Sequence, residues 1–196
     1  LSKHNAVVVT RHHLATEVGS KILLDGGNAF DAAVSVAFAL AVVNPSAGNI
    51  GGGGFALLYD ANKKTIESID YRERAPIKAE ENMFLDENGN VIQGLSTSSF
   101  LASGIPGTVD GMFKIHKKYG SLPIKKLISP AIDLAEKGFI LSKFQAEYFN
   151  SNRDKFSKNP ETKKVFVKEN LWKKGDLFLQ EDLAKTLKRI SKFGRD

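Results

Sequence analysis

The chain has 196 residues, of which 42% are hydrophobic and 26% are charged, the composition of an ordinary globular protein with enough length for one good core. It contains no cysteine, which excludes disulfides, thiolate metal sites and a cysteine nucleophile. The net charge of +6 arises in residues 143–196, where lysines and arginines are mixed with acidic and amide residues. This pattern predicts a solvated helical surface and no nucleic-acid partner.

The first predicted elements are a short strand and two helices. Residues 5–10 (NAVVVT) are rich in β-branched side chains, which predicts a buried strand. Residues 13–25 place apolar side chains at helical spacing, and Gly26-Gly27 ends that helix. Residues 29–43 are apolar on nearly every side, with Asn28 as N-cap and Asp31 in the first turn. Because a membrane span needs roughly 20 residues, we expect a helix buried between other layers and no membrane span.

A glycine run, residues 48–55 (GNIGGGGF), joins this helix to the next predicted strand. Glycine allows positive φ and a close approach to another backbone or a ligand. The order of helix, glycines and strand is the reverse of a dinucleotide-binding motif, and no Lys-Ser or Lys-Thr follows as in a Walker A loop. Nucleotide binding is therefore not expected. Spacing alone leaves open a tight connection or a backbone wall of a substrate pocket.

Residues 55–60 and 65–70 predict a β-hairpin. Helices are then predicted from Pro106 to about 119, from Pro123 to 136, from a Ser142 cap to about 150, and over 181–193, whereas residues 151–176 predict an irregular connection. This order indicates a layered α/β or α+β fold with an antiparallel piece of sheet. The sheet is thin for so many helices, so we expect missing strands in another chain or a later segment.

Few side chains offer chemistry. His12 and His13 are expected to point in different directions, and no second cluster supplies further ligands, so no metal site is predicted. No nucleophile motif is found. Arg72, in the charged turn after the hairpin, is the strongest candidate, since its planar guanidinium matches a carboxylate bidentately. Its spacing equally allows a surface salt bridge to Asp70 or Glu73.

Several motifs, taken together, resemble the γ-glutamyltransferase (γ-glutamyltranspeptidase) family. They are residues 25–34 (DGGNAFDAAV), 44–45 (NP), 48–55 (GNIGGGGF), 70–76 (DYRERAP), 82–86 (NMFLD), 104–109 (GIPGTV) and 127–132 (LISPAI). They follow one another in order over nearly the whole chain. The chain is therefore identified as the N-terminal part of a large subunit of this family.

The resemblance implies an N-terminal-nucleophile hydrolase, with an α+β fold of the αββα sandwich type that is incomplete in this chain. Residues 1–196 would form the N-terminal part of one such domain, without an internal boundary. It also implies a precursor that cleaves itself into two subunits. The new N-terminal threonine of the small subunit attacks the γ-glutamyl bond of glutathione or related compounds, and the γ-glutamyl group passes to water or to an amino-acid or peptide acceptor.

For this chain, the resemblance implies no catalytic residue, no metal and no cofactor. Its expected partners are a γ-glutamyl substrate, the small subunit and the remainder of the large subunit, in a periplasmic or extracellular location. Of the family's substrate contacts only Arg72 maps here, and it is implied to bind the α-carboxylate of the γ-glutamyl group. The glycine run would support the sheet beside the pocket. A related acylase, a poly-γ-glutamate-cleaving enzyme and a non-catalytic binding remnant remain alternatives.

Overall fold

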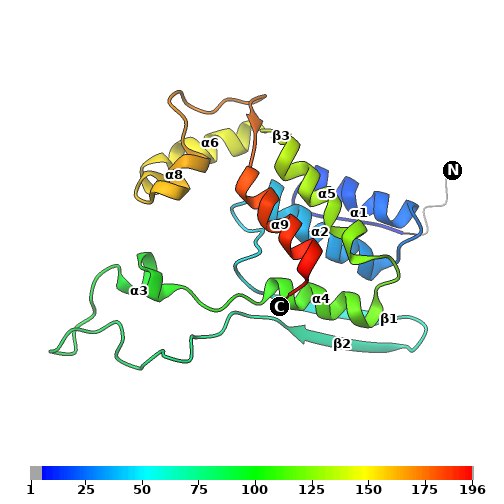
Figure 1. Ribbon diagram of the computed structural model, residues 1–196, viewed down its shortest axis with the longest axis horizontal. Helices are drawn as coiled ribbons and strands as arrows, with labels where there is room; N and C mark the ends of the chain where they lie inside the picture. The colour runs from blue at the N-terminus through cyan, green and yellow to red at the C-terminus, as the bar shows by residue number, and fades with distance from the viewer. Residues whose placement is uncertain (1–5, 196) are drawn as a thin grey trace.

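A computed structural model describes residues 6–195 of the chain (Figure 1). Its core is a set of packed helices: α1 (His13–Leu24), α2 (Ala29–Val43), α4 (Thr108–Tyr119), α5 (Ile124–Lys137) and α9 (Glu181–Phe193). Helix α2 lies at the centre and contacts α1, α4 and α5, while α9 covers α5. Because its faces meet different neighbours, α2 buries residues on nearly every side, Phe38 and Val42 among them. The prediction of a buried helix is confirmed.

The start of α2 is fixed by a capping box, as the sequence predicts. The Asn28 side chain accepts hydrogen bonds from the amides of Phe30 and Asp31, and an Asp31 carboxylate oxygen accepts from the Asn28 amide at 3.0 Å. Asp31 also accepts from the amide and hydroxyl of Ser121 and from the amide of Leu122, in the α4–α5 connection. The side chain is fully buried. One carboxylate thus joins the beginning of α2 to a loop 90 residues away.

Asp31→Asn is expected to destabilise the intact protein by about 2 kcal/mol at neutral pH, because an amide cannot accept all of these hydrogen bonds. Burial raises the pKa of Asp31, but the hydrogen bonds from Ser121, Asn28 and Leu122 outweigh it and hold the pKa below its ordinary value. The carboxylate therefore stabilises the fold above the unfolded-state pKa of about 3.9 and loses that effect as the pH falls through the lower folded-state pKa.

Thermal or urea unfolding measured from pH 7 down to pH 3 checks this prediction. The difference between wild type and Asp31→Asn should shrink at the acidic end. Asp133→Asn is the control, since Asp133 is exposed and, among residues 6–195, pairs only with Lys137 one turn away on α5. That change should alter stability by less than about 1 kcal/mol. Equal stability of wild type and the Asp31 variant at neutral pH would contradict the role assigned to this carboxylate.

The predicted hairpin is confirmed, with strands β1 (Phe55–Asp60) and β2 (Thr65–Asp70) pairing antiparallel and Phe55 opposite Asp70. On one face of β1, Leu58 is buried in the core cluster. On the other face Phe55, Leu57 and Tyr59 are 65%, 76% and 59% exposed. Helix α4 lies along the hairpin (Figure 1), and its last residues Lys118 and Tyr119 both donate to the Glu67 carboxylate on β2. A second ladder joins β3 (Phe139–Ile140) to β4 (Leu177–Phe178).

Two elements differ from the sequence predictions near the chain's beginning and middle. Of the predicted strand over residues 5–10, Asn5 lies outside the described residues, and residues 6–10 form no strand with any described residue. Val7 and Val9 are 81% and 87% exposed. A β-branched run is a strand only when a partner strand is present. Helix α4 begins at Thr108, so Pro106 does not occupy its first position. Instead Ile105 and Arg74 exchange backbone hydrogen bonds in an isolated antiparallel bridge just before the helix.

Towards the C-terminus, the predictions for Ser142 and for residues 181–193 are confirmed by α6 (Lys143–Ser151), capped by Ser142 and Gln145, and by α9. The prediction for residues 151–176 is wrong, because they include α7 (Arg153–Ser157) and α8 (Pro160–Phe166). Asn159 caps α8, and Phe156, Phe166 and Trp172 pack around Phe149 of α6. Burial of these aromatic rings outweighs the polar composition of the segment.

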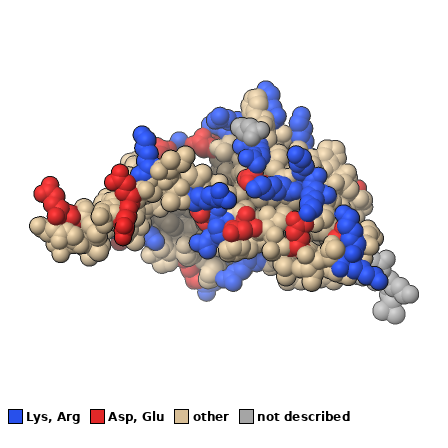
Figure 2. Space-filling model, turned by 90° about the horizontal axis from the view of Figure 1, so that it is seen from below, with Lys and Arg blue, Asp and Glu red and all other residues tan. Residues whose placement is uncertain are grey.

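Residues 77–105 extend away from the helical core (Figure 1) and contain only the short helices α3 (Leu95–Ser98) and η1 (Phe100–Ala102). Figure 2 shows the same extension projecting from the body of the molecule on the left. Several large apolar side chains in this excursion are exposed, Ile77 and Phe100 most of all. Within residues 6–195, no helix combines the length and the apolar character that crossing a bilayer requires.

Candidate substrate-binding site

Arg72 lies two residues beyond the end of β2, and the local backbone determines where it points. The Asp70 carboxylate accepts a hydrogen bond from the Arg72 amide at 2.9 Å. Tyr71 and Gly54 exchange backbone hydrogen bonds and so extend the hairpin pairing by one residue on each strand. The turn that carries Arg72 is therefore a continuation of the sheet, and such strand ends position side chains more firmly than free loops do.

The Arg72 guanidinium makes one ion pair, from Nε to a Glu73 carboxylate oxygen at 3.3 Å. Its Cζ lies 5.8 Å from the centre of the Phe55 ring, within the range of a cation–π contact. The side chain is 63% exposed, and among the described residues the terminal Nη atoms have no partner. The salt bridge to Glu73 that the spacing allows is thus present, whereas Asp70 contacts only the backbone. The two Nη groups remain able to bind a carboxylate bidentately.

Tyr71 anchors the turn that carries Arg72 by packing its ring against neighbouring elements. Its ring packs against Gly54 and Gly111, and a methyl group at Gly111 would lie 2.4 Å from the tyrosine Cγ. Its hydroxyl donates to the Phe55 carbonyl at 3.4 Å. Burial raises the pKa of the Tyr71 phenol, so the ring stays neutral. Because Tyr71 is fixed against helix α4, the backbone of the neighbouring Arg72 is held next to that helix.

The glycine run passes directly behind Arg72. A methyl group at Gly53 would lie 2.5 Å from the Tyr71 carbonyl oxygen and 2.9 Å from the Arg72 carbonyl carbon. None of the five glycines between residues 48 and 54 has a positive φ. They are therefore required here for close backbone approach, not for a left-handed turn. This agrees with the interpretation that the run supports the sheet.

The run is also connected to α4. The Gly52 carbonyl accepts hydrogen bonds from the amides of Gly107 and Thr108 at 2.8 and 3.0 Å. The Asn49 side-chain oxygen accepts from the Gly52 amide and from the Thr108 hydroxyl, at 2.9 and 2.6 Å. The glycine run, the turn carrying Arg72 and the beginning of α4 therefore form one connected backbone unit.

Sequence reasoning missed the contribution of Gly107 and Gly111 to this unit. A methyl group at Gly107 would lie 1.9 Å from the Tyr71 carbonyl oxygen, closer than any other glycine of the chain comes to a neighbour. The sequence does contain a signal for this contact, because Gly107 and Gly111 lie four positions apart at the beginning of a helix. Glycine is unfavourable inside a helix by about 1 kcal/mol, so its presence at 111 indicates that something lies close to the helix there.

His12 and His13 do not point apart as expected, because their rings stack with centres 4.7 Å apart. The Nδ1 atom of His12 accepts from the Leu14 amide and caps α1. The described residues contain no group of three or more His, Asp or Glu side chains arranged to hold a metal ion.

The sequence model of the family described as Gamma-glutamyltranspeptidase matches residues 15–196. The glutathione hydrolase proenzyme of Pseudomonas sp. is 47% identical over 98% of this chain and 34% of its own length. That of Escherichia coli is 47% identical over 93% of this chain and 32% of its own. The chain therefore spans about a third of the length of these curated relatives.

Solved structures give the same result. The crystal structure of Helicobacter pylori γ-glutamyltranspeptidase superposes with a TM-score of 0.94 at 49% identity, over 99% of this chain and 56% of that one. The Bacillus anthracis transpeptidase enzyme CapD superposes with a TM-score of 0.79 at 34% identity, over 98% and 59%. These likenesses confirm the predicted α+β N-terminal-nucleophile hydrolase fold, incomplete in this chain. The chain belongs to the γ-glutamyltranspeptidase family, of which it is an N-terminal large-subunit part.

Proposed function

We propose that the protein carrying this chain cleaves γ-glutamyl bonds, in glutathione and related compounds, and transfers the γ-glutamyl group to water or to an amino-acid or peptide acceptor. Family membership supports the reaction class, and relatives at 47% identity are named glutathione hydrolase proenzymes. The observation in this chain that carries the proposal is Arg72, whose two Nη groups are open at the end of a rigid strand extension.

In this proposal Arg72 binds the α-carboxylate of the γ-glutamyl group. A guanidinium and a carboxylate form two parallel charge-assisted hydrogen bonds, which fix both the position and the orientation of the bound group. The Glu73 pair is exposed and worth little by itself, and it engages Nε, which leaves the outer edge of the guanidinium open. Orienting the substrate at its α-carboxylate places the γ-carbonyl at a constant distance for attack.

We further propose that residues 1–196 are the N-terminal part of one domain that the rest of the protein completes. Its partners would be the remainder of the large subunit and a small subunit that begins with the nucleophilic threonine. The exposed face of β1, with Phe55, Leu57 and Tyr59, supports this arrangement, because a sheet face with three large apolar residues normally packs against another layer. A periplasmic or extracellular location follows from the family resemblance and belongs to the same proposal.

A second candidate is cleavage of a longer γ-glutamyl polymer, or a related acylase reaction. The likeness to the Bacillus anthracis transpeptidase enzyme CapD, at 34% identity, supports transfer beside hydrolysis and leaves the length of the γ-glutamyl substrate open. An arginine that binds an α-carboxylate serves a terminal γ-glutamyl group in either substrate. Comparing kcat/KM for glutathione with that for a γ-glutamyl oligomer decides between the two, and a protein that binds but cleaves neither would be a non-catalytic remnant of the fold.

The intact mature protein is expected to contain two polypeptides, the smaller of which begins with threonine. The physical reason is that an N-terminal threonine can use its own amine as the base that activates its hydroxyl. Intact-mass measurement and N-terminal sequencing of every polypeptide in the purified sample check this. A single uncleaved polypeptide with full glutathione-hydrolysing activity would contradict the proposed processing.

A further inference from the structure

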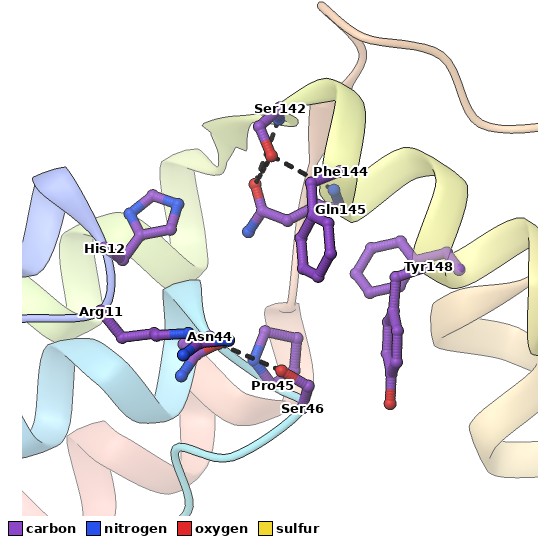
Figure 3. Close-up of a pocket in the computed structure, with 10 residues that line it drawn as sticks. Arg11, His12, Asn44, Pro45, Ser46, Ser142, Phe144, Gln145 and Tyr148 are labelled. Atoms are coloured by element: carbon purple, nitrogen blue, oxygen red, sulfur yellow. Dashed lines mark hydrogen bonds between the residues drawn. The ribbon is translucent and has the colours of Figure 1, made fainter.

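A small cavity of about 120 Å³ lies where the segment before α1, the end of α2 and the beginning of α6 meet (Figure 3). One water needs roughly 10–15 Å³ of such space, so the cavity has room for more than a single water. Arg11 and His12 line it from the first segment, Asn44 from the end of α2, and Gln145, Phe144 and Tyr148 from α6. Arg72 is not among the lining residues.

Hydrogen bonds fix the polar residues around this cavity, and His12 also interacts with the Gln145 side chain, which leaves the Asn44 amide as the donor available to a ligand. The Gln145 amide donates to the Val43 carbonyl at 2.8 Å, which ties α6 to the end of α2. The Asn44 side-chain oxygen accepts from the Ser46 hydroxyl at 3.1 Å, so the Asn44 NH₂ group remains a donor. His12 Nδ1 accepts from the Leu14 amide at 3.3 Å, so in the neutral ring the proton resides on Nε2. Burial, followed by the neighbouring His13, lowers the pKa of His12 and favours that neutral ring.

Arg11 is the one permanently charged side chain among the described residues that line the cavity, and the Glu17 carboxylate acts on His12 from outside the lining. None of the described residues that line it is an aspartate or a glutamate, although the chain contains 22 acidic residues. Arg11 is a permanent cation, and no described residue forms a salt bridge with it, whereas Lys114, Lys137 and Lys185 each pair with a carboxylate about one turn away on their own helix. Figure 3 shows the Arg11 side chain extending toward Asn44, with the Phe144 ring across the cavity. A cation, neutral donors and an aromatic wall suit a monoanion with a short apolar part.

We propose that this cavity binds a small carboxylate, held by the Arg11 guanidinium and the Asn44 amide, with its carbon chain against Phe144 and Pro45. A planar carboxylate matches the guanidinium bidentately, and one arginine balances one negative charge. The carboxylate has two conceivable sources, a free acid of about the size of propionate or an aspartate or glutamate side chain from the part of the protein outside this chain. The chemistry of recognition is the same for both.

The test uses trifluoroacetate as the probe and the intact protein that contains this chain. Fluorine NMR line broadening gives the dissociation constant for wild type, Arg11→Ala and Asn44→Asp. The second variant keeps the acceptor for Ser46 but replaces the amide donor with a carboxylate. Lys125→Ala is the matched control, because it removes one positive charge from an exposed position of α5. An Arg72→Ala background removes binding at the candidate substrate site.

Binding that persists in the Arg72→Ala background, and that weakens about tenfold or more in both cavity variants but not in Lys125→Ala, supports a free carboxylate ligand. The internal source predicts a different result: no probe binding, together with a melting temperature lowered in Arg11→Ala and unchanged in Lys125→Ala, measured in carboxylate-free buffer. If the probe does not bind and Arg11→Ala melts like the control, the proposal is wrong. Because the Arg72 background is included, failure here is distinguishable from failure of the proposed function.

Discussion

Arg72→Ala in the intact enzyme is expected to lower kcat/KM for glutathione by about 100- to 1,000-fold. The change removes a bidentate charge-assisted contact and leaves the substrate α-carboxylate without a partner, which costs about 3–4 kcal/mol in a binding site. At 1.4 kcal/mol for each factor of ten, that loss corresponds to the stated range. If the contact is equally strong in the bound substrate and in the transition state, the loss will appear mainly in KM.

Arg72→Lys should give an intermediate result, because lysine keeps the charge but presents a point donor in place of the planar pair. Arg74→Ala is the matched control. Arg74 follows two residues later in the same charged turn and holds Ile105 through its backbone, which the substitution retains. We expect kcat/KM of Arg74→Ala within about threefold of wild type, since losing an isolated surface charge costs less than about 1 kcal/mol.

The outcome also distinguishes the two interpretations of Arg72 that the sequence left open. If its only partner were Glu73, the variant would lose an exposed ion pair and little else. Wild-type kcat/KM in a folded Arg72→Ala protein would therefore establish the surface salt bridge as its whole role. A large loss with an unchanged melting temperature would assign the guanidinium to substrate binding.

The elements that the sequence predicted correctly have local signals. The Asn28 cap with Asp31, the Ser142 cap with Gln145 and the two alternating strands each depend on residues a few positions apart. Helix α9 repeats its apolar residues with a helical period over its whole length. Interactions of this range can be recognised in a sequence without knowledge of the fold.

The features that could not be predicted depend on residues far apart. Residues 6–10 have the composition of a strand but no partner in the described chain. Helices α7 and α8 are stabilised by Phe156 and Phe166 packing on Phe149. At the candidate site, the chemistry of Arg72 could be predicted from its type and its place after a strand. The glycines that support it could not, because Gly107 meets Tyr71 only once α4 has packed on the hairpin.

Gly53→Ala is expected to reduce both stability and activity although Gly53 carries no functional group. A methyl group there would lie 2.5 Å from the Tyr71 carbonyl oxygen and 2.8 Å from the Glu73 amide nitrogen, which are backbone atoms that cannot rotate away. The strand end must shift instead, at a cost of about 3 kcal/mol in stability. A displacement of about 1 Å at Arg72 would lower kcat/KM by roughly 100-fold.

Gly51→Ala provides the control within the same run of glycines. Its added methyl group would meet nothing within 4 Å, and its φ is not positive, so neither a clash nor backbone strain results. We expect its melting temperature and kcat/KM to match those of wild type. If both variants were equally impaired, the run would be needed for its flexibility as a whole. Loss of stability and activity in Gly53→Ala alone would mean that Gly53 is needed because its backbone lies close to the backbone of residues 71–73. The glycine run would then determine the position of Arg72.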